Sequence, residues 1–458
     1  MSSLNASLAT ALSGLMADQG AMQTTTNNVA NVNTPGYSRQ EPVLEASDPV
    51  VLGHLTFGTG VTLQSVESIR DALLESQIQQ QTQTENQFNT LSLALQQTQL
   101  NFTATGSDIG SEITNFFNSI NQLSTDPDDL SLRQGVLAAA GNLATSFNTA
   151  ANNLAGQRET LDLSVVQTVG QINQLTTQIA QLNGEISGLQ SSGDNAGSFV
   201  DQRQEAIDQL SALVDVSVIP TDDTLTLTTA NGAPLVSGNQ SFQLQTQSTS
   251  SGLYDVYSEG NDISSQIVSG QLGGTLQARD QQIPGFLNQL DTLAAGLANA
   301  VNGVQAQGYD LNGNPGTNLF TPPPVNGTGA AASLSVAITD PALIAASSDG
   351  SVGSNGNAEA MYALSNQPII AGQDPTDYYS GIVSNIGSAA SSASAEQSAS
   401  NLILQQLQDQ RSSVSGVSLD EEAANLVQYQ DAYQASAQVI TTINDMMYAV
   451  INMTTLTG

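Results

Sequence analysis

Both ends of the chain place apolar residues at alternating steps of four and three, the repeat of helices that pack side by side. At the N-terminal end the repeat comprises Leu4, Leu8, Ala11, Leu15, Met22, Val29 and Val32. At the C-terminal end it comprises Leu419, Ala423, Leu426, Tyr433, Ala437, Ile440, Met447 and Ile451. Asp18, Gln430 and Asn444 interrupt these repeats, so neither end is an ideal zipper. The sequence predicts that the two ends meet as packing seams and need helices beyond their own chain.

The charge of the chain excludes several classes of partner. It carries 41 acidic residues against 7 basic ones, for a net charge of −34. Such a surface repels nucleic acid and anionic lipid, so neither is an expected partner. The apolar runs are too short to span a bilayer, so no membrane insertion is expected. No Lys or Arg occurs in the first 38 residues, which argues against a secretory signal peptide.

The remaining patterns predict a mainly α fold with a small β insert. The first helix is expected from about Ser3 to Asn33, where Thr34-Pro35-Gly36 stops it, and residues 42–64 read as a loop with a short hairpin. Further helical patterns cover 66–103, 126 onward, 158–190, 198–214, 276–307, 374–413 and 418 to the end. Asp126 is the expected N-cap of the second pattern, Ser198-Phe199-Val200-Asp201 resembles a capping box, and Asp374-Pro375 is expected to open the helix at 374. Alternating strand patterns cover 225–229, 242–246, 253–258 and 334–338, with Asn231-Gly232 as a hairpin turn.

At 458 residues the chain is too long for one compact core, and we expect three domains. The expected terminal domain, with coiled-coil-like paired helices, comprises residues 1–64 and 415–458. A helical body comprises residues 65–215, 268–320 and 355–414. An outer β domain comprises residues 216–267 and 321–354.

An enzyme would need a site, and the sequence shows none. His54 is the single histidine and reads as a surface or turn residue, while cysteine and lysine are absent. Asp310-Leu311-Asn312-Gly313 mimics the start of a calcium loop, but Pro315 stands where such a loop requires glycine, so it reads as a turn. Adjacent carboxylates at Asp222-Asp223 and Glu421-Glu422 read as a turn and a helix start. We therefore expect no catalytic residues, no metal and no cofactor.

One motif is sharp. The segment Asn27 to Gln40 places several asparagines at a helix end and follows them with Thr34-Pro35-Gly36-Tyr37. Asparagine is a poor helix former and a good turn former, so these amides can bond neighbouring backbone groups. The candidate site residues of this motif are Asn28, Asn31, Asn33, Thr34, Pro35, Gly36, Tyr37 and Arg39. From physics alone an ordinary helix stop explains the segment equally well.

This segment resembles the N-terminal signature of the axial proteins of the bacterial flagellum, the family of rod, hook and hook-associated proteins. Residues 415–437 resemble the C-terminal signature of that family. Three body segments favour its hook–filament junction members over its rod and hook members, namely 201–210, 272–280 and 307–313. The motifs follow the order of the family, but the chain is short for it, so its outer domain is expected to be reduced.

The resemblance implies a structural, non-enzymatic subunit that self-associates in a ring or helical lattice at the hook–filament junction. It implies export by the flagellar type III apparatus, with an export chaperone at the C-terminus and with the hook protein and the second junction protein as neighbours. Two alternatives stay open. A rod or hook protein of the same family would be favoured by a β-dominated body. A secreted adhesin-like filament protein could use terminal coiled coils, but it would not require the turn motif of residues 27–40 with its Asn/Thr-Pro-Gly-Tyr sequence, which we call the elbow.

Overall fold

The structure is a computed structural model that describes residues 2–34, 36–52, 55–103, 108–192, 196–220 and 225–455. It confirms a mainly helical fold with a small β content. The chain divides into two compact units: unit 1 comprises residues 1–83, 171–244 and 401–458, and unit 2 comprises residues 84–170 and 245–400. In the described ranges, no helix has the length and apolar character needed to cross a membrane.

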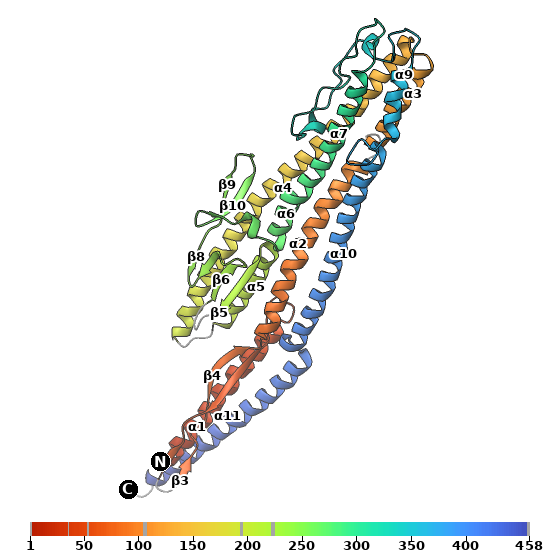
Figure 1. The fold of residues 1–458 in the computed structure, drawn as a ribbon. Coiled ribbons are helices and arrows are strands. Elements are labelled where there is room, and N and C mark those ends of the chain that lie inside the picture. Colours follow the sequence, from red (N-terminus) through yellow and green to blue (C-terminus); the bar gives the residue numbers. More distant parts are fainter. Residues whose placement is uncertain are drawn as a thin grey trace. The chain divides into compact units, whose positions relative to one another are not determined.

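Unit 1 contains both ends of the chain. Its complete helices are α1 (Ser2–Ala30), α5 (Gly197–Leu213) and α11 (Leu419–Thr455). It also contains parts of three longer helices that contribute to both units: α2 (Ala72–Thr103), α4 (Leu130–Ser192) and α10 (Pro375–Ser415). Figure 1 shows α1 and α11 side by side, with the two chain ends at the same end of this pair. The prediction that the ends meet is confirmed.

Two small β structures belong to unit 1. Strands β1 (Gln40–Ala46) and β4 (Val61–Ser68) pair antiparallel with a bulge at Val43/Leu44, and β2 (Val50–Leu52) pairs with β3 (Leu55–Phe57). The second is a four-stranded antiparallel sheet in sequence order, composed of β5 (Val216–Pro220), β6 (Leu225–Thr229), β7 (Pro234–Ser237) and β8 (Gln240–Ser241). Gly232 has φ +90° in the turn after β6, which confirms the predicted Asn-Gly hairpin.

Unit 2 is a helical body with one apolar core. Its complete helices are α3 (Ile109–Thr125), α6 (Gly270–Gln277), α7 (Ile283–Gln305), α8 (Ala330–Ser333) and α9 (Gly356–Ala363), and a π-helical turn at Ala278–Gln282 joins α6 to α7. A three-stranded sheet is formed by β9 (Gln245–Ser248), β10 (Tyr254–Ser258) and β11 (Asn261–Asp262). Phe116, Phe147 and Phe320 are fully buried in the core, which therefore joins segments about 200 residues apart.

The buried Arg279 lies on the π-helical turn and locks the β9–β11 sheet to the helices of unit 2. Its guanidinium donates to Asp162 at 2.6 Å, to Asp280 at 2.8 Å and to the carbonyl of Tyr254 at 2.6 Å. Burial alone would lower the pKa of Arg279, but the carboxylates of Asp280 and Asp162 raise it. The arginine of the second body motif therefore has a structural partner set.

Five local predictions are wrong. The predicted strand 242–246 is not formed as such, because β8 ends at Ser241 and β9 begins at Gln245. Helix α2 begins at Ala72 rather than at residue 66, because β4 continues to Ser68. Helix α4 is capped by Asp129 rather than Asp126, since the Asp129 carboxylate accepts from the amides of Ser131 and Leu132. The capping box expected at Ser198 is absent, because Asp201 bonds Arg70 instead. The predicted strand 334–338 is a single bridge between Val336 and Phe320.

The three-domain division stays a prediction. Within unit 2, the segment after Phe320 does not form a separate sheet: Ala331, Leu334 and Ile344 are buried in the core with α3, α4 and α7. The turn at Asp310 is confirmed, since its carboxylate accepts from the amides of Asn312 and Asn314. His54, Pro35 and the pair Asp222-Asp223 lie outside the described residues.

Candidate functional site

The paired ends of the chain form the candidate site, and their packing is antiparallel. A side chain added at Gly14 would come within 3.4 Å of the hydroxyl of Ser436, while Asn28 bonds Glu422 further along the pair. Helix α1 also packs on strand β4, because a Cβ atom at Gly20 would come within 2.6 Å of the Leu63 side chain. The contact at Gly14 is an ordinary van der Waals distance, whereas at Gly20 the absence of a Cβ atom lets α1 approach the Leu63 side chain closely.

The buried face of α1 is made of small and polar residues rather than of the predicted seam. Ala17, Ala21, Thr24, Thr25 and Asn28 are buried and follow one face of the helix. The predicted N-terminal seam is half-buried at Leu4, Leu8, Ala11, Leu15, Met22 and Val32, and exposed at Val29. Within one chain the predicted seam is therefore only partly covered.

The C-terminal helix is even less covered. Of the predicted C-terminal seam, Leu426, Tyr433, Ala437, Ile440 and Met447 are half-buried, whereas Leu419, Ala423 and Ile451 are exposed. In the described part of α11, the fully buried residues are Glu422 and Ile443. A helix of 37 residues that buries so little depends on further partners for its stability.

Asn28 connects three segments at the end of the helix pair that lies away from the chain termini. Its amide nitrogen donates to the carbonyl of Gln40 at 2.8 Å and to Glu422 Oε2 at 3.1 Å. Its amide oxygen accepts from the backbone N–H of Gln40 at 2.9 Å and from the Tyr37 hydroxyl at 2.8 Å. The full hydrogen-bonding capacity of a buried asparagine is thus used, which fixes α1, β1 and α11 relative to one another.

The turn after α1 is built by the other residues of the motif. Asn31 donates to the backbone carbonyl of Asn27 at 3.0 Å, and the Thr34 hydroxyl donates to Asn31 Oδ1 at 3.1 Å. Gly36 has φ +76°, and a Cβ atom there would come within 2.8 Å of Glu205 Oε2 on α5. The positive φ therefore favours glycine, whereas the flexible Glu205 side chain could move away from an added Cβ atom. Asn33 is exposed.

Arg39 joins the turn to the start of α11. Its Nε donates to Glu422 Oε1 and its Nη1 to Glu421 Oε2, both at 2.8 Å, and its backbone N–H donates to the carbonyl of Ser415 at 2.9 Å. The Glu422 side chain is only 2% exposed, so its charge needs this partner. The sequence had assigned Glu421 and Glu422 to the helix start alone. The lone arginine of the elbow was the one signal for an ion pair.

Packing around the elbow shifts the pKa values of two neighbouring ionisable groups, Tyr37 and Asp201. Burial raises the pKa of Tyr37 to about 12, with further contributions from the charges of Asp201 and Glu422. Burial also raises the pKa of Asp201, although its ion pair with Arg70 opposes this. Tyr37 thus stays protonated and donates to Asn28 at any physiological pH.

A second ionic cluster holds the end of α10 against α5. Arg411 Nη1 lies 3.5 Å from Glu75 Oε2 and 3.5 Å from Asp208 Oδ2. Burial raises the pKa of Asp208 to about 6, against the opposing effects of Gln204 and Arg411. One guanidinium therefore serves two carboxylates close to the linker that leads into α11.

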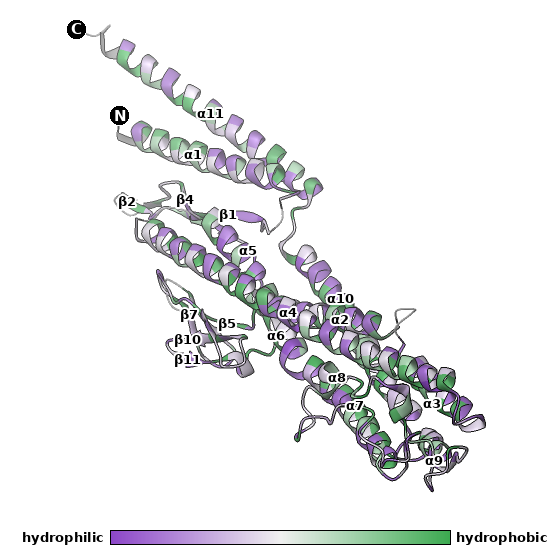
Figure 2. Ribbon diagram, turned by 90° about the horizontal axis from the view of Figure 1, so that it is seen from above, coloured by the Kyte–Doolittle hydropathy of each residue, from purple (hydrophilic) through white to green (hydrophobic). Residues whose placement is uncertain are grey.

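Exposed apolar side chains gather on the chain ends. More than half of the exposed large apolar residues in the described ranges lie between residues 12 and 57 or between 419 and 451. They are Leu12, Met16, Val29, Leu44, Val50, Val51, Leu55, Phe57, Leu419, Val427, Val439, Met446, Tyr448, Val450 and Ile451. Figure 2 shows hydrophobic residues along the whole of α1 and α11. In a chain of net charge −34, this concentration of exposed apolar side chains makes the chain ends the candidate interaction surface.

The charged groups of the site are held in ion pairs, and its exposed surface is apolar. Within the described ranges, no group of three or more His, Cys, Asp or Glu side chains is placed to hold a metal ion. The charged groups of the site, Arg39, Glu422 and Asp201, are already paired with one another or with neighbours. The site therefore offers a fixed elbow and an apolar surface.

Known proteins share these segments. Residues 8–37 match the model of flagella basal body rod proteins, 95–320 that of the flagellar hook-associated protein FlgK helical domain, and 408–453 that of the flagellar basal body rod FlgEFG protein C-terminal region. Flagellar hook-associated protein 1 of Bacillus subtilis is 31% identical over 99% of this chain and 99% of its own length. Its counterpart in Salmonella typhimurium is 28% identical over 97% and 99%.

A solved structure has the same fold. It is the flagellar hook junction protein FlgK from Burkholderia pseudomallei, with a TM-score of 0.68 and 19% sequence identity. The likeness covers 74% of this chain and all of that one. At this identity it establishes the fold.

Proposed function

The chain belongs to the flagellar hook-associated protein 1 family and has a structural role in the bacterial flagellum, and on that premise we propose that it forms the adaptor between hook and filament. The alignments with the two bacterial relatives named above cover 97% and 99% of this chain. Both the terminal signatures and the helical body are present, in the order of the family.

The exposed apolar surface of the chain ends is the observation that carries this proposal. Completely burying one Val, Leu, Met or Phe side chain contributes about 1.5–3 kcal/mol. The side chains at the chain ends are 37–69% exposed, so burying the rest of each contributes about half as much, and many of them together are needed to offset the roughly 4–15 kcal/mol that association costs in lost freedom. The exposed side chains of α1 and α11, together with the partly covered seams beside them, would thus pack against neighbouring copies in a ring or helical lattice. The Asn28 elbow would set the direction of the pair.

The finer partners are part of the same proposal. The subunit would contact the hook protein on one side and the second junction protein on the other. It would leave the cell through the flagellar type III apparatus, with an export chaperone bound to its C-terminal end. Because α11 buries so little in the monomer, a chaperone could cover its apolar side chains before assembly. No catalytic role is proposed.

A deletion strain tests the function. Cells without this chain should make hooks but no filaments, and they should release filament protein into the medium. Electron microscopy of the cell surface and analysis of the medium measure both effects. Supplying the intact chain should restore filaments. Normal filaments on the deletion strain would contradict an adaptor role.

A further inference from the structure

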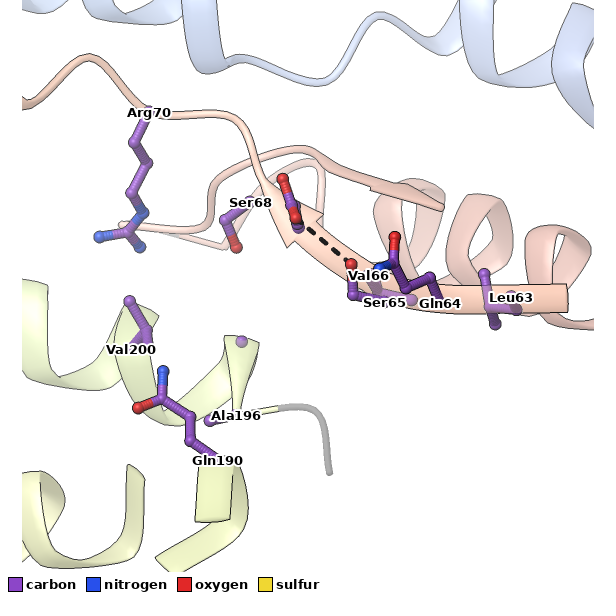
Figure 3. A pocket seen from close by; sticks show the side chains of 11 residues that line it. Leu63, Gln64, Ser65, Val66, Ser68, Arg70, Gln190, Ala196 and Val200 are labelled. Carbon is purple, nitrogen blue, oxygen red and sulfur yellow. Dashed lines mark hydrogen bonds between the residues drawn. The ribbon is translucent and has the colours of Figure 1, made fainter. Parts of the chain in front are cut away.

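Unit 1 contains a groove that the elbow and the helix pair do not use. It has a volume of about 550 Å³ and lies between β4 and the start of α5. One wall is Leu63–Ser68 with Arg70, and the other includes Gln190, Ala196 and Val200. Figure 3 shows the Arg70 side chain extending from the end of β4 toward Val200 on α5.

The strand wall of this groove has an unpaired edge. Among the described strands, β4 pairs with β1 and with no other, so its second edge has no strand partner. Such an edge offers main-chain N–H and C=O groups to an extended segment of another chain. Glu67 and Gln64 are exposed on this strand, which leaves its side open to solvent.

Polar atoms at one end of the groove also lack partners. Ser68 Oγ and Arg70 Nε are buried without a hydrogen bond among the described residues. The same guanidinium is held in place through its bond to Asp201. Both atoms are closed to solvent, so an oxygen acceptor in the groove would reach them only if the side chains of Ser68 and Arg70 turned toward it. Their unsatisfied state favours such a turn.

A complementary element projects from the same ribbon. Val50, Val51, Leu55 and Phe57 on β2 and β3 are between 49% and 66% exposed. A two-stranded hairpin of this size is marginal by itself and needs a surface to pack on. Asp48 precedes β2, is exposed, and supplies a carboxylate beside these apolar side chains.

The hairpin cannot reach the groove of its own chain. It lies at one end of the ribbon whose strand β4 forms the groove wall, and Phe57 precedes Val66 by nine residues. Val61, where β4 begins, precedes Val66 by five strand residues, so this part of the groove wall lies on the order of 16 Å along the ribbon from the end that carries the hairpin. A second copy of the chain can present its hairpin there.

We infer that β2 and β3 of one copy dock into the β4–α5 groove of the next copy, adding a strand beside β4 and directing Asp48 toward Arg70. Because donor and acceptor surfaces differ, the contact is head-to-tail and generates a ring or a helix. The inference rests on the proposed function only in requiring that copies meet. It adds a specific contact away from the helix seams.

Cross-linking tests the contact, and the absence of native cysteine makes introduced thiols unique. Two differently tagged versions, Val51→Cys and Gln64→Cys, are expressed in one strain, and isolated flagella are treated with a short bismaleimide. A covalent dimer carrying both tags is expected. Its yield should exceed that of the control pair Val51→Cys and Val325→Cys at least several-fold, since Val325 is fully exposed in a loop of unit 2. Asp48→Lys in the Val51→Cys version should lower the yield.

The outcomes separate the two proposals. Filaments on these cells without a mixed dimer above the control would overturn the hairpin contact and leave the adaptor role intact. Filaments on the deletion strain would overturn the adaptor role and, with it, the contact. A mixed dimer above the control, lowered by Asp48→Lys, supports the docking.

Discussion

Asn28 on α1 donates a hydrogen bond of 3.1 Å to Glu422 on α11, across 394 residues of sequence. Both side chains are buried, and both also bond the elbow that follows α1. The two chain ends are therefore fixed together by polar groups, while their apolar side chains stay exposed. This combination gives a subunit a defined end that is still able to bind its neighbours.

Asn28→Ala should weaken the elbow strongly. The change leaves Glu422, the Tyr37 hydroxyl and both the N–H and the carbonyl of Gln40 each without one partner, so we expect a loss of roughly 2–4 kcal/mol in the stability of the helix pair. Urea denaturation of the purified chain, followed by hydrogen exchange at the start of α11, measures it. Asn33→Ala is the matched control, because Asn33 is exposed and should change stability by less than about 0.5 kcal/mol. Equal effects of both changes would contradict the role of Asn28.

The two glutamates paired with Arg39 should differ sharply. Glu422→Gln removes a charge that is 2% exposed and should cost about 1–3 kcal/mol, because Arg39 then loses its buried partner. Glu421→Gln removes a charge that is 60% exposed and should cost less than about 0.5 kcal/mol. Thermal denaturation of both variants makes the comparison. A larger loss for Glu421→Gln would show that burial does not decide the strength of these pairs.

The stability of unit 1 should depend on Asp208. Its pKa is raised from 3.8 to about 6, so the folded state binds a proton more readily than the unfolded state. The ionised Asp208 therefore lowers the free energy of unfolding above pH 6. This unfavourable contribution decreases as the pH falls from 6 to about 4. Asp208→Asn should stabilise the chain by roughly 1–2 kcal/mol at pH 8 and by much less at pH 4. Urea midpoints at both pH values test this, and a gain that is the same at both would contradict it.

The chain ends should be the least protected part of the isolated subunit. In its described part, α11 fully buries Glu422 and Ile443, whereas α7 buries a continuous stripe that includes Phe286, Leu290 and Leu297. Amides of α1 and α11 should therefore exchange orders of magnitude faster than those of α7. Hydrogen exchange with mass spectrometry resolves these segments. Comparable protection of α11 and α7 would show that the ends need no partners.

Local patterns predicted the helices and the elbow, and long-range pairing was beyond them. The capping carboxylate of Asp374 is confirmed, because its bonds reach residues 376 and 377. The partners of Arg39 were missed, since nothing near Arg39 points to residues 421 and 422. The buried face of α1 was missed because Ala17, Ala21 and Thr24 are small, whereas periodicity gives most weight to large apolar residues.

The predicted strand at 334–338 and the predicted capping box at Ser198 failed where tertiary packing decided the conformation. Residues 334–338 have the alternation of a strand, yet Leu334 and Ile338 are buried among helices of unit 2. Asp201 stands at the last position of the expected capping box, but its carboxylate accepts a hydrogen bond from Arg70 instead. In each case a contact distant in sequence outweighed a local propensity.

The central claim is that exposed apolar side chains on α1 and α11 build the junction, and charge substitutions test it most directly. Met16→Asp and Val427→Asp place charges on side chains that are 60% and 57% exposed in the monomer, so each monomer should fold and be exported. Buried at every subunit contact, each charge should cost several kcal/mol and prevent assembly. Electron microscopy should show hooks without filaments for both variants and normal filaments for the control Val325→Asp. Filaments of normal length on Met16→Asp and Val427→Asp cells would contradict the account.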